Sequence, residues 1–180
     1  MIRLRSDETL GWSSSHRRRS DGAIESTQRM VAPRPVVERT ADGARMLGAA
    51  YWREVERLTR GLVRTRSSND GMELRVAPRG PTLLRFGTPQ LTVTNDAVST
   101  SYPITGGMLA RRAAGSITLS MRGGAGRVEL RSAIVGYHPT LAARPGAPAW
   151  TGELYDQIQA RVHARVSRRY FHRLIDRLAP

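Results

Sequence analysis

The sequence predicts an α+β domain in which an antiparallel sheet of about six strands packs against a long C-terminal helix, with a shorter helix nearer the N-terminus. Two patterns support this prediction. Apolar residues recur at helical spacing in residues 40–62 and again in residues 150–178. Between them, over residues 72–137, apolar and polar residues alternate with the period of two that is typical of strands.

Residues 1–38 show neither period. They are rich in arginine, serine and aspartate, so we expect a disordered basic tail. An alternative interpretation takes Met30 as the start of translation and the preceding residues as an extension of the gene model. Residues 39–180 are expected to form a single α+β domain, since a chain of 180 residues has the usual length of one domain.

The shorter helix is expected to begin at Thr40 or Asp42, whose side-chain oxygen can accept a hydrogen bond from the free N–H groups of the first turn. One face of this helix is apolar and consists of Leu47, Tyr51, Val55, Leu58 and Leu62. The segment from Ser67 to Gly71 then has the composition of a loop. The helix therefore has one side that the rest of the domain must cover.

Short strands follow this loop. The positions that alternate on one side are Met72, Leu74 and Val76; Leu84 and Phe86; Leu91 and Val93; Val98, Thr100 and Tyr102; Ile117, Leu119 and Met121; and Val128 and Leu130. Glycine, proline and asparagine mark the connections between them. Because each strand alternates instead of being apolar throughout, we expect one covered and one wetter face, which indicates an antiparallel sheet.

The long helix is predicted from Trp150 to Leu178 and would span about 42 Å at the usual rise per residue. Its apolar stripe consists of Leu154, Ile158, Val162, Val166, Tyr170, Leu174 and Leu178, with Tyr155, Phe171 and Ile175 beside them. Beside the stripe lies an arginine row at the same spacing, made of Arg161, Arg165, Arg169, Arg173 and Arg177. Three interpretations of this row are open: a solvated flank of the core, a phosphate-binding surface, or a contact with a partner subunit.

This order of elements, over residues 40–178, resembles the helix-grip fold of the START-like family, which includes polyketide cyclases and lipid-transfer proteins. Members of that family usually begin with a strand ahead of the first helices, and here Arg34 to Glu38 is the segment that could supply it. The resemblance implies a cavity between the long helix and the sheet that accepts an apolar ligand.

The segment from Tyr102 to Arg112 is the most distinctive one that periodicity does not explain. Paired glycines allow close approach of the backbone, and two nearby arginines can hold a phosphate or carboxylate. We therefore expect non-enzymatic binding of an apolar or amphipathic small molecule in a pocket whose mouth is formed by Tyr102, Thr105, Gly106, Gly107, Arg111, Arg112, Tyr137 and His138. The competing interpretation is a bulge or wide connection with both arginines in solvent.

The formal net charge is +14, and all 29 basic residues are arginine. Such a charge attracts polyanions, so the alternative function is a basic interaction module that binds nucleic acid or an anionic membrane surface. Its contact residues would be Arg17, Arg18, Arg19, Arg161, Arg165, Arg169, Arg173 and Arg177. The coding bias of a GC-rich genome also produces arginine-rich, lysine-free sequences without selection for any partner.

Catalytic chemistry has little support in the sequence. There is no cysteine, which excludes disulfides, thiolate nucleophiles and cysteine-ligated metals. His163 and His172 lie nine positions apart, on opposite sides of one helix, and cannot chelate one ion. No cofactor or metal is expected, and an enzyme, the third possibility, would use His138 or Tyr102 as acid or base. Without a signal sequence or a membrane-spanning run, the expected location is cytoplasmic.

Overall fold

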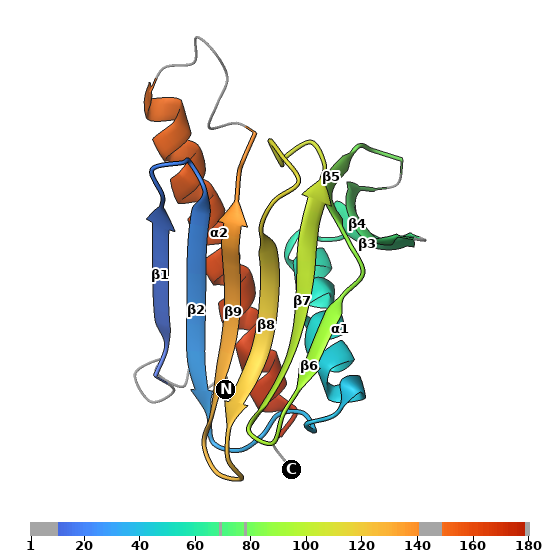
Figure 1. Cartoon of the computed structure of the whole chain (residues 1–180), viewed down its shortest axis with the longest axis vertical. Helices are drawn as coiled ribbons and strands as arrows, with labels where there is room; N and C mark the ends of the chain where they lie inside the picture. Colours follow the sequence, from blue (N-terminus) through green and yellow to red (C-terminus); the bar gives the residue numbers. More distant parts are fainter. Residues whose placement is uncertain (1–10, 69, 78, 141–148, 179–180) are drawn as a thin grey trace.

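One antiparallel sheet carries two helices on the same face in the computed structural model, which describes residues 11–68, 70–77, 79–140 and 149–178 (Figure 1). For residue 68 and residues 149–160, the description is limited to the backbone. The expected α+β class and the long C-terminal helix are confirmed. The number of strands was underestimated, because the described part of the chain has nine rather than about six.

The strands, in chain order, are β1 (Ser13–Arg18), β2 (Ile24–Ala32), β3 (Val63–Ser68), β4 (Gly71–Val76), β5 (Thr82–Phe86), β6 (Gln90–Val93), β7 (Ala97–Gly106), β8 (Ser116–Gly123) and β9 (Val128–Tyr137). The helices are α1 (Ala41–Leu58) and α2 (Ala149–Asp176). Across the sheet the order is β1-β2-β9-β8-β7-β5-β4-β3, and the neighbouring strands are antiparallel. β6 pairs with the first half of β7 and β5 with its second half.

The N-terminal region differs most from the prediction, because residues 13–32 form two strands where a disordered tail is expected. β2 lies between β1 and β9 and is therefore an interior strand of the sheet. Its inward-facing residues are Ile24, Ser26, Gln28, Met30 and Ala32, and all five are buried. Two of these five are polar, so the apolar alternation that marks a strand in a sequence is interrupted. The segment 34–38 is not a strand, and residues 1–10 lie outside the described part.

Helix α1 begins as predicted, since the Thr40 side chain accepts a hydrogen bond from Gly43 N at 3.1 Å. It ends at Leu58, one turn before the predicted end at Leu62, which is exposed instead of buried. The helix passes very close to β7, because a Cβ added at Gly48 would lie 2.0 Å from the Tyr102 hydroxyl. Glycine at this position therefore determines how near α1 packs to the sheet.

Helix α2 buries most of the predicted stripe in its described C-terminal part. Val166, Tyr170 and Leu174 are buried as predicted, but Val162 is half exposed. Phe171 and Ile175, predicted beside that row, are also buried, and so are His163 and Ser167. A row of every fourth residue drifts by about 40° per step around a helix, so such a row cannot stay on one face over the whole length. The predicted positions Leu154 and Ile158 have side chains outside the described part.

The core lies between the helices and the inner face of the sheet. Its largest buried side chains include Leu119 and Met121 of β8, Leu130 and Tyr137 of β9, and Phe171 of α2. An aromatic chain connects the elements, with Tyr51 of α1 placed 5.5 Å from Tyr170 and 5.1 Å from Trp52 between ring centroids. Among the described residues, no helix is long and apolar enough to cross a membrane.

Candidate functional site

An open groove with a volume of about 460 Å³ lies beside α1, over strands β3, β4, β6 and β7. We call it the α1 groove. Its apolar lining comes from Trp52, Met72, Leu91 and Tyr102, and Ala49, Arg45 and Arg53 line it from the exposed side of α1. None of its described lining residues belongs to α2, and in Figure 1 most of α2 lies behind β2, β9 and β8, away from β3 and β4. The groove therefore does not lie under α2, where the resemblance to helix-grip proteins implies a cavity.

The groove exists because small side chains meet where α1 crosses the outer strands. Ala49 on the helix faces Thr65 and Ser67 of β3, Gly71 of β4 and Thr100 of β7 across it. None of these residues is large enough to fill the space between a helix and a strand. The backbones of β4 and β5 also pack closely beside the groove, since a Cβ added at Gly71 would lie 2.1 Å from Phe86 O.

The floor of the groove is an aromatic cluster. The rings of Trp52 and Tyr102 meet edge to face at 5.3 Å, and Phe86 lies 5.0 Å from Trp52. Edge-to-face and tilted contacts of this kind are favourable and fix the orientation of each ring. The apolar surface is therefore formed in advance of any ligand. Of the eight residues predicted to bind a ligand, Tyr102 is the one that lines this groove.

Two kinds of polar group belong to the groove. Trp52 Nε1 and Thr100 Oγ1 are buried and have no hydrogen-bond partner among the described residues, which is unusual in a folded protein. At the rim, Arg53 Nε donates to Ala49 O at 3.3 Å, and Arg45 pairs with the exposed Asp42 at 2.6 Å. The sequence could not single out Trp52 and Thr100, because both lie at ordinary core positions of a helix and a strand.

The predicted glycine pair has a packing role. Gly106 and Gly107 have φ values of +148° and +112°, and a Cβ at Gly107 would lie 2.5 Å from Leu83 O. This close approach lets the segment after β7 bond to β5, as in the hydrogen bond from Leu109 N to Leu83 O at 3.0 Å. Thr105 is exposed. The paired glycines therefore allow close packing between the backbone of β5 and the segment after β7.

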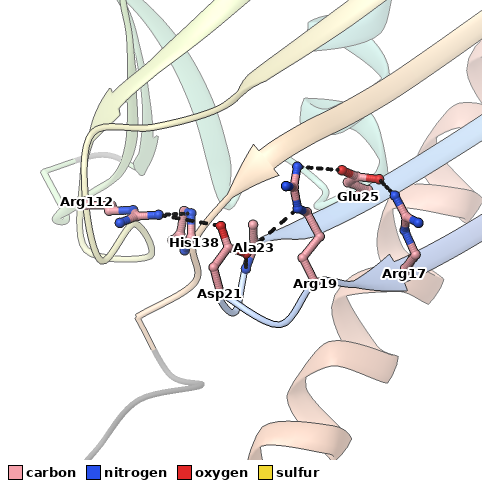
Figure 2. A network of polar contacts seen from close by, with 7 residues as sticks. All are labelled: Arg17, Arg19, Asp21, Ala23, Glu25, Arg112 and His138. Carbon is pink, nitrogen blue, oxygen red and sulfur yellow. Dashed lines mark hydrogen bonds and ion pairs between the residues drawn. The ribbon is translucent and has the colours of Figure 1, made fainter.

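The other four predicted residues, Arg111, Arg112, Tyr137 and His138, lie near the end of β9, and Figure 2 shows Arg112 and His138 pointing toward one another. Arg112 Nη2 lies 2.6 Å from His138 Nε2, and Arg111 N donates to His138 O at 2.8 Å. The Tyr137 hydroxyl donates to Leu109 O at 2.6 Å. A guanidinium can only donate, so the Nε2 atom of His138 accepts and the ring is neutral. Burial and the charge of Arg112 both lower the pKa of His138, consistent with that neutral ring.

The β1–β2 turn brings carboxylates to this cluster that the sequence analysis did not include. Asp21 lies 3.9 Å from Arg112 and accepts a hydrogen bond from Ala23 N, which lowers the pKa of its carboxyl group. Glu25 is 2.6 Å from Arg17 and 3.3 Å from Arg19, and the bond from Arg17 is the main reason that its pKa is lowered. Figure 2 shows these pairs as one continuous chain of contacts. The exposed Arg18 lies between Arg17 and Arg19 on the chain.

The arginine row of α2 is divided by an ion-pair cluster. Glu54 of α1 has a fully buried side chain, and its carboxylate oxygens lie 2.9 Å from Arg169 Nε and 2.7 Å from Arg173 Nε. Arg57 lies 3.7 Å from the same carboxylate. These contacts join α1 to α2. Arg161, Arg165 and Arg177 are exposed, so the row that the sequence predicts as a polyanion-binding face is only partly available.

A buried polar network lies between α2 and the sheet. His163 Nε2 is 3.1 Å from Ser132 Oγ, and His163 Nδ1 is 3.2 Å from Ser26 Oγ. Burial lowers the pKa of His163 to about 3 and raises that of Tyr51, which also hydrogen-bonds to Ser132. Within the described residues, no group of histidines and carboxylates could hold a metal ion. This histidine is therefore part of the core packing.

Two solved structures show a distant likeness to this chain in the arrangement of helices and strands. One solved structure with this likeness is the lipid transfer and protein localization domain of human StarD13 (DLC2), at 11% identity and a TM-score of 0.40, covering 89% of this chain and 90% of that one. Another is CalU16 from Micromonospora echinospora, at 13% identity and a TM-score of 0.29, covering 89% of this chain and 96% of that one.

No model of a protein family matches the chain, and no curated protein matches it significantly. At such low identities, the two structures concern the arrangement of helices and strands alone, and nothing about ligand or activity follows from them. The functional conclusion must therefore come from the residues of this chain.

Proposed function

We propose that this protein binds an amphipathic small molecule with an apolar body and an anionic head in the α1 groove. The observation that supports the proposal is the groove itself, whose volume of about 460 Å³ is typical of a small-molecule site. Its apolar floor and charged rim match the two ends of such a ligand. The site expected from the sequence shares Tyr102 with this groove and otherwise lies elsewhere.

The apolar body would lie on Trp52 and Tyr102, between Met72 and Leu91. Burying apolar surface contributes about 25 cal/mol per Å², and aromatic rings provide that surface without losing side-chain freedom on binding, because packing already holds them. Met72 has an unbranched, adaptable side chain that can follow the shape of different ligands. These features favour recognition of an apolar shape over recognition of one defined polar pattern.

The anionic head would lie at the rim near Arg53 and Arg45. The Nε atom of Arg53 donates a hydrogen bond to Ala49 O of the same helix. Arg53 forms no ion pair with a carboxylate among the described residues. A guanidinium can bind a carboxylate or sulfate through two parallel hydrogen bonds. Arg45 already has Asp42 as a partner, so Arg53 is the stronger candidate for the head group.

Binding without catalysis is the proposed activity. The described residues that line the groove include no histidine, aspartate or glutamate. Tyr102, the other acid or base considered from the sequence, lines the groove, but its hydroxyl packs against Gly48 of α1. The enzyme hypothesis with His138 as base would need another site, since that residue lies at the end of β9 against Arg112.

Calorimetric titration with decanoate tests this proposal. We expect wild-type protein to bind decanoate and Ala49→Trp to bind it at least tenfold more weakly, because the indole would fill the groove. Ala41→Trp is the matched control: Ala41 is exposed on the same helix, does not line the groove, and should leave the affinity unchanged. Equal affinity of Ala49→Trp and wild type, with both folded by circular dichroism, would contradict the proposal.

The head-group assignment is tested with Arg53→Ala. This variant should lose about three- to tenfold in affinity for decanoate, the usual effect of removing one charge-assisted hydrogen bond at an exposed position. Its affinity for 1-decanol, which has the same body and no charge, should not change. A loss of equal size for both probes would mean that Arg53 contributes packing and not charge recognition.

A further inference from the structure

A second cavity, with a volume of about 580 Å³, lies at the C-terminal end of α1 against the outer strands β3 and β4. We call it the arginine pocket, because it is lined by Arg60, Arg64, Arg66 and Arg75. Its remaining lining comes from backbone and small or apolar residues, among them Gly61, Leu62 and Ala77. None of these four arginines belongs to the sets predicted from the sequence.

Strand register forces two of these arginines together. Arg64 of β3 is directly opposite Arg75 of β4, and like charges in directly opposed positions destabilise a sheet. Arg66 is opposite Glu73, whose carboxylate lies 3.8 Å from Arg75. Among the described residues, Arg60, Arg64 and Arg66 form no ion pair. The pocket therefore carries excess positive charge that the described part of the protein does not neutralise.

The backbone places Arg60 at this pocket in an unfavourable conformation. Its φ of +52° makes it the one non-glycine residue in the described chain with a positive φ. The left-handed region costs about 1 kcal/mol for such a residue, and glycine or asparagine is usual at this point after a helix. Hydrogen bonds from Arg60 N to Arg57 O and from Gly61 N to Glu56 O hold the turn. The fold therefore brings the Arg60 side chain to the pocket at a cost in backbone energy.

The frame beneath the arginines is rigid. Glu56 of α1 accepts hydrogen bonds from Thr65 N at 2.7 Å and Thr65 Oγ1 at 2.6 Å, which ties β3 to the helix. Ala77 N donates to Leu62 O at 2.8 Å and closes the other side. Arg75 itself donates to Gly80 O at 3.2 Å. The pocket is thus formed before binding, which lowers the entropy that a ligand must lose.

We infer that the arginine pocket binds a phosphate group, as a phosphomonoester or pyrophosphate. A dianion between Arg64 and Arg75 would turn their repulsion into two attractive contacts, and guanidinium groups bind phosphate oxygens in pairs. The C-terminal end of α1 carries a partial negative charge, which offsets about half of the charge of one arginine. Most of the positive charge of the pocket therefore remains. This inference does not depend on the proposed function, because Thr65 is the one residue that lines both cavities.

Inorganic pyrophosphate is the first probe, and thermal denaturation the first readout. We expect pyrophosphate to raise the Tm of wild-type protein and to have no effect on Arg64→Gln/Arg75→Gln. The matched control, Arg122→Gln/Arg127→Gln, removes the same charge from exposed positions around the β8–β9 turn and should keep the wild-type response. Affinity measured by calorimetry should fall at least tenfold in the first variant and less than twofold in the control.

Two outcomes would overturn the inference. One is the absence of any pyrophosphate effect on wild-type protein at low salt. The other is an equal loss in both double variants, which would mean that net charge and not the pocket attracts the anion. Without its opposed arginines, the Arg64→Gln/Arg75→Gln variant should be at least as stable as wild type in the absence of phosphate, so misfolding would not obscure the result.

Vesicles distinguish the source of the phosphate. If the ligand is a lipid headgroup, phosphatidylcholine vesicles that contain phosphatidic acid should bind the protein, and pyrophosphate should displace it from them. Vesicles with phosphatidylserine, whose phosphate is a diester, should bind less well at equal surface charge. If pyrophosphate binds and phosphatidic acid vesicles do not, the ligand is a soluble phosphate compound.

Discussion

His163 is the residue whose environment differs most from what its sequence position indicates. It lies on the buried side of α2 and meets Ser26 and Ser132, two residues from distant parts of the chain. Each ring nitrogen has one hydroxyl neighbour, so a neutral ring is fully satisfied there, whereas a charged ring would lack a counter-ion within this set. The network stabilises the contact between α2 and strands β2 and β9 while the ring is neutral.

Acid should weaken this contact over a defined pH range. The pKa of His163 is about 3 in the folded protein and 6.5 ordinarily, so the unfolded chain takes up a proton first as the pH falls. Its contribution to stability is complete above about pH 6.5 and is lost progressively down to about pH 3. Between pH 7 and pH 5, this term should remove about 2 kcal/mol from the free energy of unfolding.

Urea denaturation of wild type and His163→Asn at pH 7 and pH 5 measures that term. Burial also lowers the pKa values of His138 and His172, and their effect on stability has the same sign, so the difference between the two proteins is the quantity to compare. The variant should lose less stability than wild type between these pH values. Equal losses would show that His163 does not control the acid response.

Single residues were predicted from the sequence with mixed success. Tyr102 lines the α1 groove, whereas Arg112 and His138 are in contact with each other at the end of β9, away from that groove. The sequence gives no reason to assign a role to Asp21 or Glu54, because their ion-pair partners are far away along the chain. Contacts over such separations depend on strand register and helix packing, which local sequence patterns do not specify.

At the scale of elements, β2 makes the N-terminal region part of the sheet. It pairs with β1 on one side and with β9 on the other, and its inner face is buried along the whole strand. Met30 is one of the residues of that face and has no exposed surface. The first strands are therefore part of the core of the domain, and not an appended tail.

Met30→Ala should consequently be strongly destabilising. Removing a buried methionine side chain costs about 2–5 kcal/mol, through lost burial and the cavity left behind. Arg29→Ala is the control, because the neighbouring side chain is exposed and its 3.7 Å pair with Glu129 is a surface contact that contributes about 1 kcal/mol at most. Chemical denaturation followed by circular dichroism gives both values. A cost for Met30→Ala no greater than that of Arg29→Ala would mean that β2 does not support the fold in solution.

Elements with a regular pattern could be predicted. The sequence indicates both helices and the strands β4 to β9, because apolar residues recur in each with the period of a helix or of a strand. β2 was missed because Ser26 and Gln28 occupy inward positions, and β3 because the arginines at Arg64 and Arg66 alternate with other polar residues. Polar residues inside a sheet remove the very signal on which such predictions rely.

At the scale of the whole molecule, the two helices contact the sheet in different ways. The long helix packs on the sheet through buried side chains from Val166 to Ile175. The α1 groove lies beside the other helix, where α1 meets strands with small side chains. Individual arginines of this chain, whose net charge is +14, have separate structural roles. Arg169 and Arg173 join α2 to α1 through Glu54, and Arg53 lines the α1 groove.

Native mass spectrometry of the protein purified from its own host tests the central claim most directly. Wild-type protein and Ala49→Trp would be expressed and purified in parallel, and each sample compared before and after denaturation. We predict a bound small molecule with an apolar body and an anionic head on wild type, released on denaturation and absent from the variant. A molecule retained equally by both proteins, or the bare mass of the chain for wild type, would contradict binding in the α1 groove.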